Sequence, residues 1–130
     1  MKILFDTNVL FAAFISHGVC NALYEEVLLK GQLVVSESIL EELQTKLISK
    51  AKLTKQESME VVAAIRSDAD VVESPPFGRP ICRDSEDDHI LSAALHGKVD
   101  ILVTGDRDLL VLKSFQAIPI LTPRECLECF

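Results

Sequence analysis

The stretch Lys2-Ile3-Leu4-Phe5-Asp6-Thr7-Asn8 joins a short apolar run to a polar group near the start of the chain. Residues 2–5 have the character of a buried strand, and the apolar residues from Asn8 to Ile15 continue with helical character. Asp6 therefore falls where a strand is predicted to end and a helix to begin. Ligands collect at the carboxyl ends of strands in open α/β sheets, so Asp6 is a candidate site residue. The alternative interpretation is that it only caps the helix.

A second strand end of this kind lies at Thr104-Gly105-Asp106, which follows the apolar run 101–103. Glycine permits a tight turn, and such a turn would direct Asp106 toward the edge of the sheet that carries Asp6. Asp108 is also close, although its simpler interpretation is an acid favoured by the dipole at the start of a short helix. Two parallel strands are thus predicted to deliver two aspartates to one edge.

The rest of the chain alternates between strand and helix patterns without internal repeats, which predicts an α/β fold. The proline-rich segment Ser74 to Pro80 is expected to be a surface loop, because proline disfavours both helix interiors and central strands. Further strands are expected at Leu33–Val35, Asp70–Val72 and Ile118–Leu121. Further helices are expected from Cys20 to Lys30 with Gly31 as the stop, from Ser36 to about Ser49, after the capping box Thr54-x-x-Glu57, within Asp84 to Gly97, from Arg107 to Leu112, and after Thr122-Pro123.

The length and charge of the chain limit what it can be. A chain of 130 residues can bury one core, so a single domain covering residues 1–130 is expected. Charged residues interrupt every apolar run before bilayer-spanning length and no signal-peptide pattern is visible, so we expect a cytoplasmic protein with no membrane partner and free cysteine thiols. A formal net charge of -7 argues against nucleic-acid binding by blanket phosphate neutralisation. A protein of this charge that acts on nucleic acid needs bound cations.

The run Arg83-Asp84-Ser85-Glu86-Asp87-Asp88-His89 looks like a solvated acidic segment, which is the usual fate of such a cluster. Helical spacing separates its members, because the positions three, four and seven residues after Asp87 are all apolar. Asp87 is therefore predicted to lie on the buried face, where a carboxylate needs a partner, hydrogen bonds or a metal. Asp84 precedes the helix and is a candidate cap or supporting acid.

One glutamate completes the set of candidate acids. Glu41 and Glu42 share a predicted helix, and Glu42 lies nearer to the edge of its apolar stripe. Glu42 is the better inward candidate, while the alternative on this pattern alone is two solvated glutamates. No serine or cysteine lies beside an identifiable base, so covalent hydrolase chemistry has no support.

Taken together, these motifs resemble the PIN-domain family over essentially the whole chain, and in particular the single-domain toxin components of toxin-antitoxin systems related to VapC toxins. The resemblance rests on Asp6-Thr7-Asn8, Ser36 through Glu42-Leu43, Asp84-x-x-Asp87 and the motif Val103-Thr104-Gly105-Asp106-x-Asp108-Leu109-Leu110. It implies a three-layer α/β fold with a parallel five-stranded sheet in the order 3-2-1-4-5 flanked by helices. It also implies an endoribonuclease with Mg²⁺ or Mn²⁺ as cofactor, RNA as substrate, an antitoxin as partner and a homodimeric state. The implied catalytic and metal-binding acids are Asp6, Glu42, Asp87 and Asp106; the supporting residues are Asn8 and Thr104, with Asp84 and Asp108 as further candidates.

The chemistry of four carboxylates agrees with this assignment. Carboxylates gathered in one pocket repel one another and take up protons unless hard cations neutralise them. Oxygen-only ligation suits one or two Mg²⁺ or Mn²⁺ ions better than zinc. The expected reaction is hydrolysis of an RNA phosphodiester bond to a 5′-phosphate and a 3′-hydroxyl, and Arg79, Arg83, Arg107 and Lys113 are candidate phosphate contacts at the rim.

Two other interpretations stay open. Phosphoryl transfer through Asp6 as nucleophile is disfavoured, because position 8 is Asn where such phosphatases have a second acid. The other is a PIN-like module that binds RNA or protein without turnover. If the chain dimerises, the apolar side chains Phe11, Phe14 and Ile15 are the candidate surface.

Overall fold

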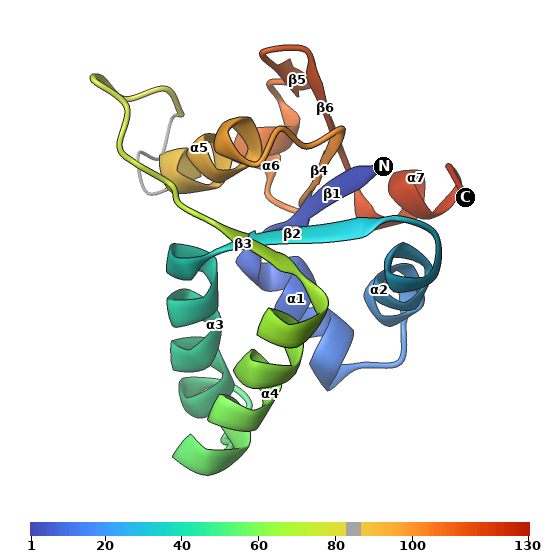
Figure 1. The fold of residues 1–130 in the computed structure, drawn as a ribbon, viewed down its shortest axis with the longest axis vertical. Helices are drawn as coiled ribbons and strands as arrows, with labels where there is room; N and C mark the ends of the chain where they lie inside the picture. The colour runs from blue at the N-terminus through green and yellow to red at the C-terminus, as the bar shows by residue number, and fades with distance from the viewer. Residues whose placement is uncertain (83–86) are drawn as a thin grey trace.

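The computed structural model describes residues 1–82 and 87–130. Its centre is a six-stranded sheet in the order β3-β2-β1-β4-β6-β5 (Figure 1). All neighbouring strands are parallel except β5 and β6, which pair antiparallel. The strands are β1 (Lys2–Phe5), β2 (Gln32–Ser36), β3 (Asp70–Val72), β4 (Ile101–Val103), β5 (Ser114–Phe115) and β6 (Ile118–Leu121).

Helices cover both faces of this sheet, with α5 on one face and α1 and α2 on the other (Figure 1). The helices α3 and α4 pack against each other below the sheet, and α7 packs against α2 (Figure 1). Within the described residues no helix is both long enough and apolar enough to cross a bilayer. The helices are α1 (Thr7–Ile15), α2 (Val19–Lys30), α3 (Glu37–Ser49), α4 (Lys55–Asp68), α5 (Asp88–His96), α6 (Arg107–Leu110) and α7 (Pro123–Leu127).

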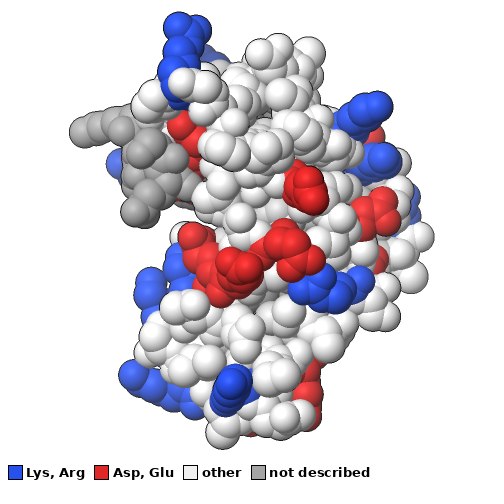
Figure 2. Space-filling view, turned by 60° about the vertical axis from the view of Figure 1, so that its left-hand side comes forward, with Lys and Arg blue, Asp and Glu red and all other residues white. Residues whose placement is uncertain are grey.

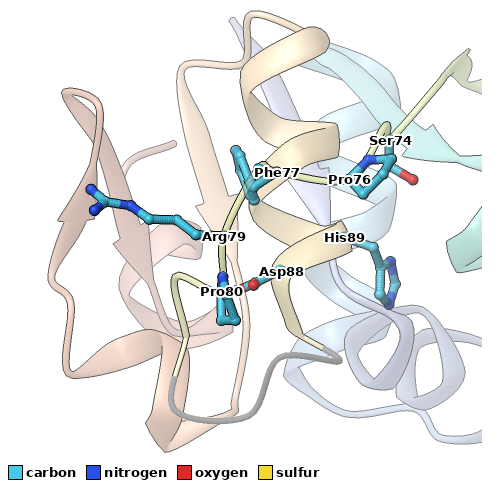
Figure 3. Close-up of a pocket in the computed structure, with 8 residues that line it drawn as sticks. Ser74, Pro76, Phe77, Arg79, Pro80, Asp88 and His89 are labelled. Carbon is cyan, nitrogen blue, oxygen red and sulfur yellow. The ribbon is translucent and has the colours of Figure 1, made fainter.

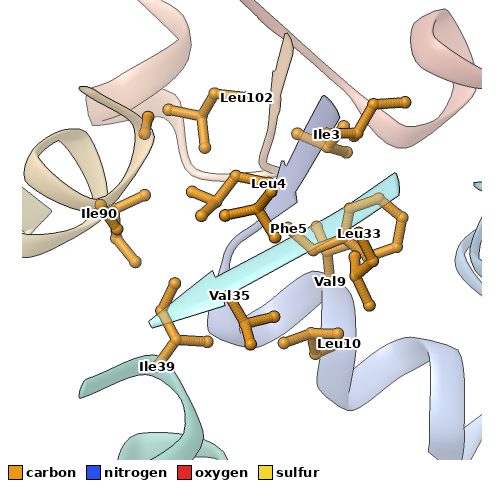
Figure 4. Packing of buried hydrophobic residues seen from close by; sticks show 14 of the residues in the cluster. Ile3, Leu4, Phe5, Val9, Leu10, Leu33, Val35, Ile39, Ile90 and Leu102 are labelled. Atoms are coloured by element: carbon orange, nitrogen blue, oxygen red, sulfur yellow. The ribbon is translucent and has the colours of Figure 1, made fainter. Parts of the chain in front are cut away.

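The core is layered by the alternation of side chains along each strand. Leu4 is in register with Val34 and Leu102, so these three side chains share one face. That face meets α5, because a Cβ added to Gly97 at its end would lie 2.8 Å from a Val34 methyl group. Phe5 lies on the opposite face, with its ring centroid 6.3 Å from that of Tyr24 in α2. Figure 4 shows the strand side chains packed between these layers.

The predicted α/β fold is confirmed, and the sheet has one more strand than predicted. The five parallel strands have the expected order, and β5 is an additional short strand at the edge. β5 is joined to β6 through Gln116 and Ala117, which both have positive φ, of 50° and 67°. Turns of this kind are normally marked by Asn or Gly, so the sequence carries no signal for this hairpin.

Most helix starts carry the predicted caps. The Ser36 hydroxyl accepts a hydrogen bond from the Ile39 amide at 3.1 Å, and Thr54 and Thr122 each begin a complete capping box. The helix stop predicted at Gly31 is confirmed, because α2 ends at Lys30. The φ of Gly31 is -139°, so no left-handed turn is formed there. The glycine permits close approach, since an added Cβ would lie 2.9 Å from the Met1 carbonyl oxygen.

The start of α5 also differs from the prediction. The helix begins at Asp88, and Asp87 is the residue that precedes it rather than a member of its buried face. The periodicity argument for Asp87 was therefore wrong, although the residue does line the cleft described below. The Asp88 carboxylate accepts hydrogen bonds from the preceding loop, from the amides of Ile81 and Cys82 at 2.9 and 2.7 Å. The predicted supporting residue Asp84 lies outside the described residues.

Candidate functional site

A polar cleft of about 200 Å³ lies at the carboxyl ends of β1 and β4. This is the edge at which ligands bind in open α/β sheets. Figure 2 shows acidic side chains gathered in a hollow of one face, with Lys and Arg side chains near its borders. The four acids expected from the sequence all line the cleft. Its lining residues are Asp6, Thr7, Asn8, Glu42, Lys46, Asp87, His89, Ile90, Asp106 and Leu109.

Asp6 is both a helix cap and a cleft residue, so the two interpretations of it are compatible. One of its carboxylate oxygens accepts a hydrogen bond from the Val9 amide at 2.8 Å, and the other accepts one from the Thr104 hydroxyl. Only 5% of its surface is exposed. Burial raises the pKa of Asp6 above its ordinary 3.8, and the charge of Asp106 adds to this, while the two hydrogen bonds and Lys46 oppose it.

Thr104 connects the two strand ends that deliver the aspartates. Its hydroxyl donates to Asp6 and accepts a hydrogen bond from the Asp106 amide at 3.0 Å. Asp106 then caps α6 by accepting from the Asp108 amide at 2.9 Å. Because Thr104 is fully buried, this chain of hydrogen bonds sets the distance between Asp6 and Asp106 without solvent.

Three aspartates approach one another closely enough to share a cation. One carboxylate oxygen from each of Asp87, Asp106 and Asp108 lies within 4.8 Å of the other two. All three side chains are partly exposed, so the group is open to solvent and to substrate. The sequence indicated Asp108 as a helix-start acid and as a further candidate for a supporting residue, and the turn of α6 brings it into this group. Oxygen donors at this spacing fit a hard divalent ion such as Mg²⁺ or Mn²⁺.

Glu42 lies on the far side of the cleft, on α3. Its carboxylate is 3.8 Å from His89 Nε2, and 44% of its side chain is exposed. One helical turn later, Lys46 Nζ donates to the side-chain oxygen of Asn8 at 2.7 Å. Sequence reasoning missed Lys46, although its position four residues after Glu42 places both on one face of α3. Among the described residues that line the cleft, Lys46 is the one lysine or arginine, and Asn8 holds it beside the acids.

The fold and the cleft define the class of the protein: an α/β domain that gathers carboxylates at the carboxyl edge of a parallel sheet. The family model described as PIN domain matches residues 2–108, and the chain belongs to the PIN-domain family. PIN domains are generally nucleases and usually use divalent metals.

One relative matches the chain along its whole length, and solved structures share its fold. The chain is 28% identical to an uncharacterized protein of Methanocaldococcus jannaschii, MJ1680, over all of this chain and 92% of the relative. The fold is similar to VapBC2 from Rickettsia felis, solved bound to a DNA fragment from its promoter, with a TM-score of 0.69 and 17% identity over 94% of this chain and 98% of that one. It is also similar to PAE2754 from Pyrobaculum aerophilum, with a TM-score of 0.64 and 18% identity over 98% and 88% of the two chains.

Proposed function

We propose that residues 1–130 form a single PIN domain that cleaves RNA internally with Mg²⁺ or Mn²⁺, and that it is the toxin of a toxin-antitoxin pair. The observation that carries the proposal is the gathering of Asp87, Asp106 and Asp108 within 4.8 Å, in a cleft that also contains Asp6 and Glu42. Membership of a family of nucleases supports hydrolysis of a phosphodiester bond.

The cation would be held by Asp87, Asp106 and Asp108, with Asp6 supporting Asp106 through Thr104. A bound Mg²⁺ or Mn²⁺ supplies positive charge to a site that carries an excess of carboxylates, and it lowers the pKa of water. This fits a chain of net charge -7, because bound cations would offset part of the repulsion between the chain and a phosphate backbone.

The chain's own residues then bind and orient the substrate. Lys46 is held by Asn8 at the cleft, where its ammonium group can contact a phosphate oxygen. Glu42 is exposed beside His89 on the opposite wall, where its carboxylate can accept a proton from a water molecule. The hydrogen-bonded link from Asp6 through Thr104 to Asp106 holds these two carboxylates in place, which would orient a substrate bound beside them.

The test is cleavage of a mixed RNA substrate with Mg²⁺, Mn²⁺ or EDTA. Asp106→Asn should reduce cleavage at least a hundredfold, because it removes the charge of one of the three carboxylates that would hold the cation. Asp100→Asn is a matched control, because this exposed aspartate precedes the same strand at the opposite edge and only accepts a hydrogen bond from the Lys2 amide. Cleavage that survives both EDTA and Asp106→Asn would refute the proposal. Metal-independent RNA or protein binding without cleavage would favour a binding module.

An antitoxin partner is part of the proposal, and the structural likeness to VapBC2 supports it. Expression of the wild-type chain in a bacterial host should then arrest growth, and Asp106→Asn should not. A homodimer through α1 also stays a proposal. Ile15 is 46% exposed, whereas Phe14 is packed edge-on against Tyr24 with ring centroids 5.2 Å apart. Ile15→Glu should lower the sedimentation mass at micromolar concentration if this surface is the interface, and a monomeric wild type would refute it.

A further inference from the structure

A second and larger cavity adjoins the carboxylate cleft. It has a volume of about 460 Å³ and lies between the loop after β3 and the start of α5. His89 lines both cavities, so they share a wall. The loop leaves β3 at the carboxyl edge of the sheet, the same edge that carries Asp6 and Asp106. The lining residues are Ser74, Pro76, Phe77, Gly78, Arg79, Pro80, Asp88 and His89.

Residues 73–82, the described part of the loop that forms this cavity, are held at three points, although they contain no helix or strand. At its start, the Ser92 hydroxyl donates to the Pro75 carbonyl at 2.5 Å. In its middle, the ring of Phe77 packs edge-on against Phe115, with centroids 5.8 Å apart. At its end, the Asp88 carboxylate accepts the amides of two loop residues. A cavity with walls held in this way is formed before a ligand arrives, which lowers the entropy lost on binding.

The chemistry of the lining differs from that of the cleft. Pro76, Phe77 and Pro80 supply apolar walls. Asp88 is the one acid among the described lining residues, and both of its carboxylate oxygens accept hydrogen bonds from backbone amides. Figure 3 shows Arg79 extending away on one side of the loop and the His89 ring lying on the other. A flat ring attached to a negatively charged chain fits such a place, because the ring can lie against Phe77. The phosphate groups on its two sides can then lie at the carboxylate cleft beyond His89 and near Arg79 on the other side of the loop.

We propose that this cavity is a nucleobase subsite, which takes an unstacked base of single-stranded RNA next to the phosphate bound at the carboxylates. The inference rests on the proposed ribonuclease function, and it adds that the residues lining this cavity select the RNA base beside the cleaved bond. The shared wall at His89 places base and phosphate pockets side by side, as adjacent parts of one strand require. The volume of the proposed base cavity, about 460 Å³, lies within the roughly 300–1,000 Å³ typical of ligand pockets.

The test measures binding, so that it does not depend on turnover. In the Asp106→Asn background, a short unstructured RNA is compared by fluorescence anisotropy with RNAs that carry one abasic position each. One abasic position should weaken binding about tenfold, the loss expected for one stacked base. Phe77→Leu keeps an apolar side chain but removes the aromatic face, and it should weaken binding of the intact RNA by a similar factor. With the RNA whose abasic position weakens binding, Phe77→Leu should cause no further loss of affinity.

Phe14→Leu is the matched control, because it makes the same change in a partly buried ring outside the cavity. It should leave RNA binding unchanged. The double variant Asp106→Asn, Phe77→Leu is compared with Asp106→Asn alone. If both bind every RNA with equal affinity, the proposal is overturned, and a protein partner becomes the occupant to test. If Phe77→Leu weakens binding of the intact RNA but not of the abasic RNA, and the wild type cleaves no RNA, the subsite is supported and the ribonuclease function is refuted. If the wild type cleaves RNA but Phe77→Leu weakens both RNAs equally, the ribonuclease function is supported and the subsite is refuted.

Discussion

Replacing Thr104 with valine tests the hydrogen-bonded link between the two aspartates. Valine has nearly the same shape but cannot donate to Asp6 or accept from the Asp106 amide. A hydrogen bond to a charged group contributes about 1.5–3 kcal/mol, and an amide left without its acceptor adds about 1 kcal/mol or more. Burial of the extra methyl group returns about 1 kcal/mol. The variant should therefore lose about 2–3 kcal/mol of unfolding free energy.

The melting temperature gives this loss a measurable size. With an unfolding entropy of roughly 2.1 cal/mol/K per residue, 1 kcal/mol corresponds to about 4 °C for a chain of this length, so Thr104→Val should melt about 10 °C lower. Thr104→Ser is the control, because it keeps the hydroxyl and loses only a methyl group at a fully buried position. Calorimetry of both variants in EDTA would measure the difference.

The pH dependence of this loss has a definite sign. The Thr104 hydrogen bond lowers the pKa of Asp6, although burial raises that pKa overall. Valine therefore raises the pKa of Asp6 further and destabilises the ionised form most. The loss should be largest at pH 8 and should shrink as pH falls through the pKa of Asp6 toward 3.8. A loss that is the same at all pH values, or no larger than that of Thr104→Ser, would refute the proposed link.

Three further predictions follow from the same contacts. Asp6→Asn should raise the melting temperature of the metal-free protein at neutral pH. Because the pKa of Asp6 is raised in the folded state, the stability of the wild type falls as pH rises above 3.8. Calorimetry across this pH range should show no such fall for the variant. Gly97→Ala should lose about 1–3 kcal/mol in chemical denaturation, because its Cβ would meet Val34 at 2.8 Å, whereas Gly105→Ala should be neutral because an added Cβ has open space; equal effects would contradict the packing of α5. Glu42→Gln should reduce RNA cleavage without reducing Mn²⁺ affinity, and a matching loss of affinity would make Glu42 a metal ligand instead.

The parts of the fold that could be predicted from sequence are those set by local chemistry. The apolar runs before Asp6 and Thr104 are strands. The acids that follow them, Asp6 and Asp106, lie at the same edge because a parallel sheet puts the carboxyl ends of its strands together. The capping boxes at Thr54 and Thr122 were visible because their two hydrogen bonds join residues only three apart. Short-range patterns of this kind carry their own geometry.

The features that sequence reasoning missed depend on contacts between distant segments. Lys46 enters the cleft because α3 packs beside α1, which puts its ammonium group against Asn8, 38 residues away. Asp108 joins Asp87 through the placement of α5 beside α6, which no local pattern encodes. The position of Asp87 was predicted from helical spacing, but α5 begins at Asp88, so Asp87 lies just before the helix.

The most direct test of the carboxylate centre is the initial rate of RNA cleavage as a function of Mn²⁺ concentration, compared between wild type, Asp106→Asn and Asp100→Asn. The wild type and Asp100→Asn should show the same saturable dependence on Mn²⁺ and no cleavage in EDTA. Asp106→Asn should lose at least a hundredfold in rate at every concentration. A rate that does not depend on Mn²⁺, or an equal loss in both variants, would contradict a metal-dependent nuclease site at these aspartates.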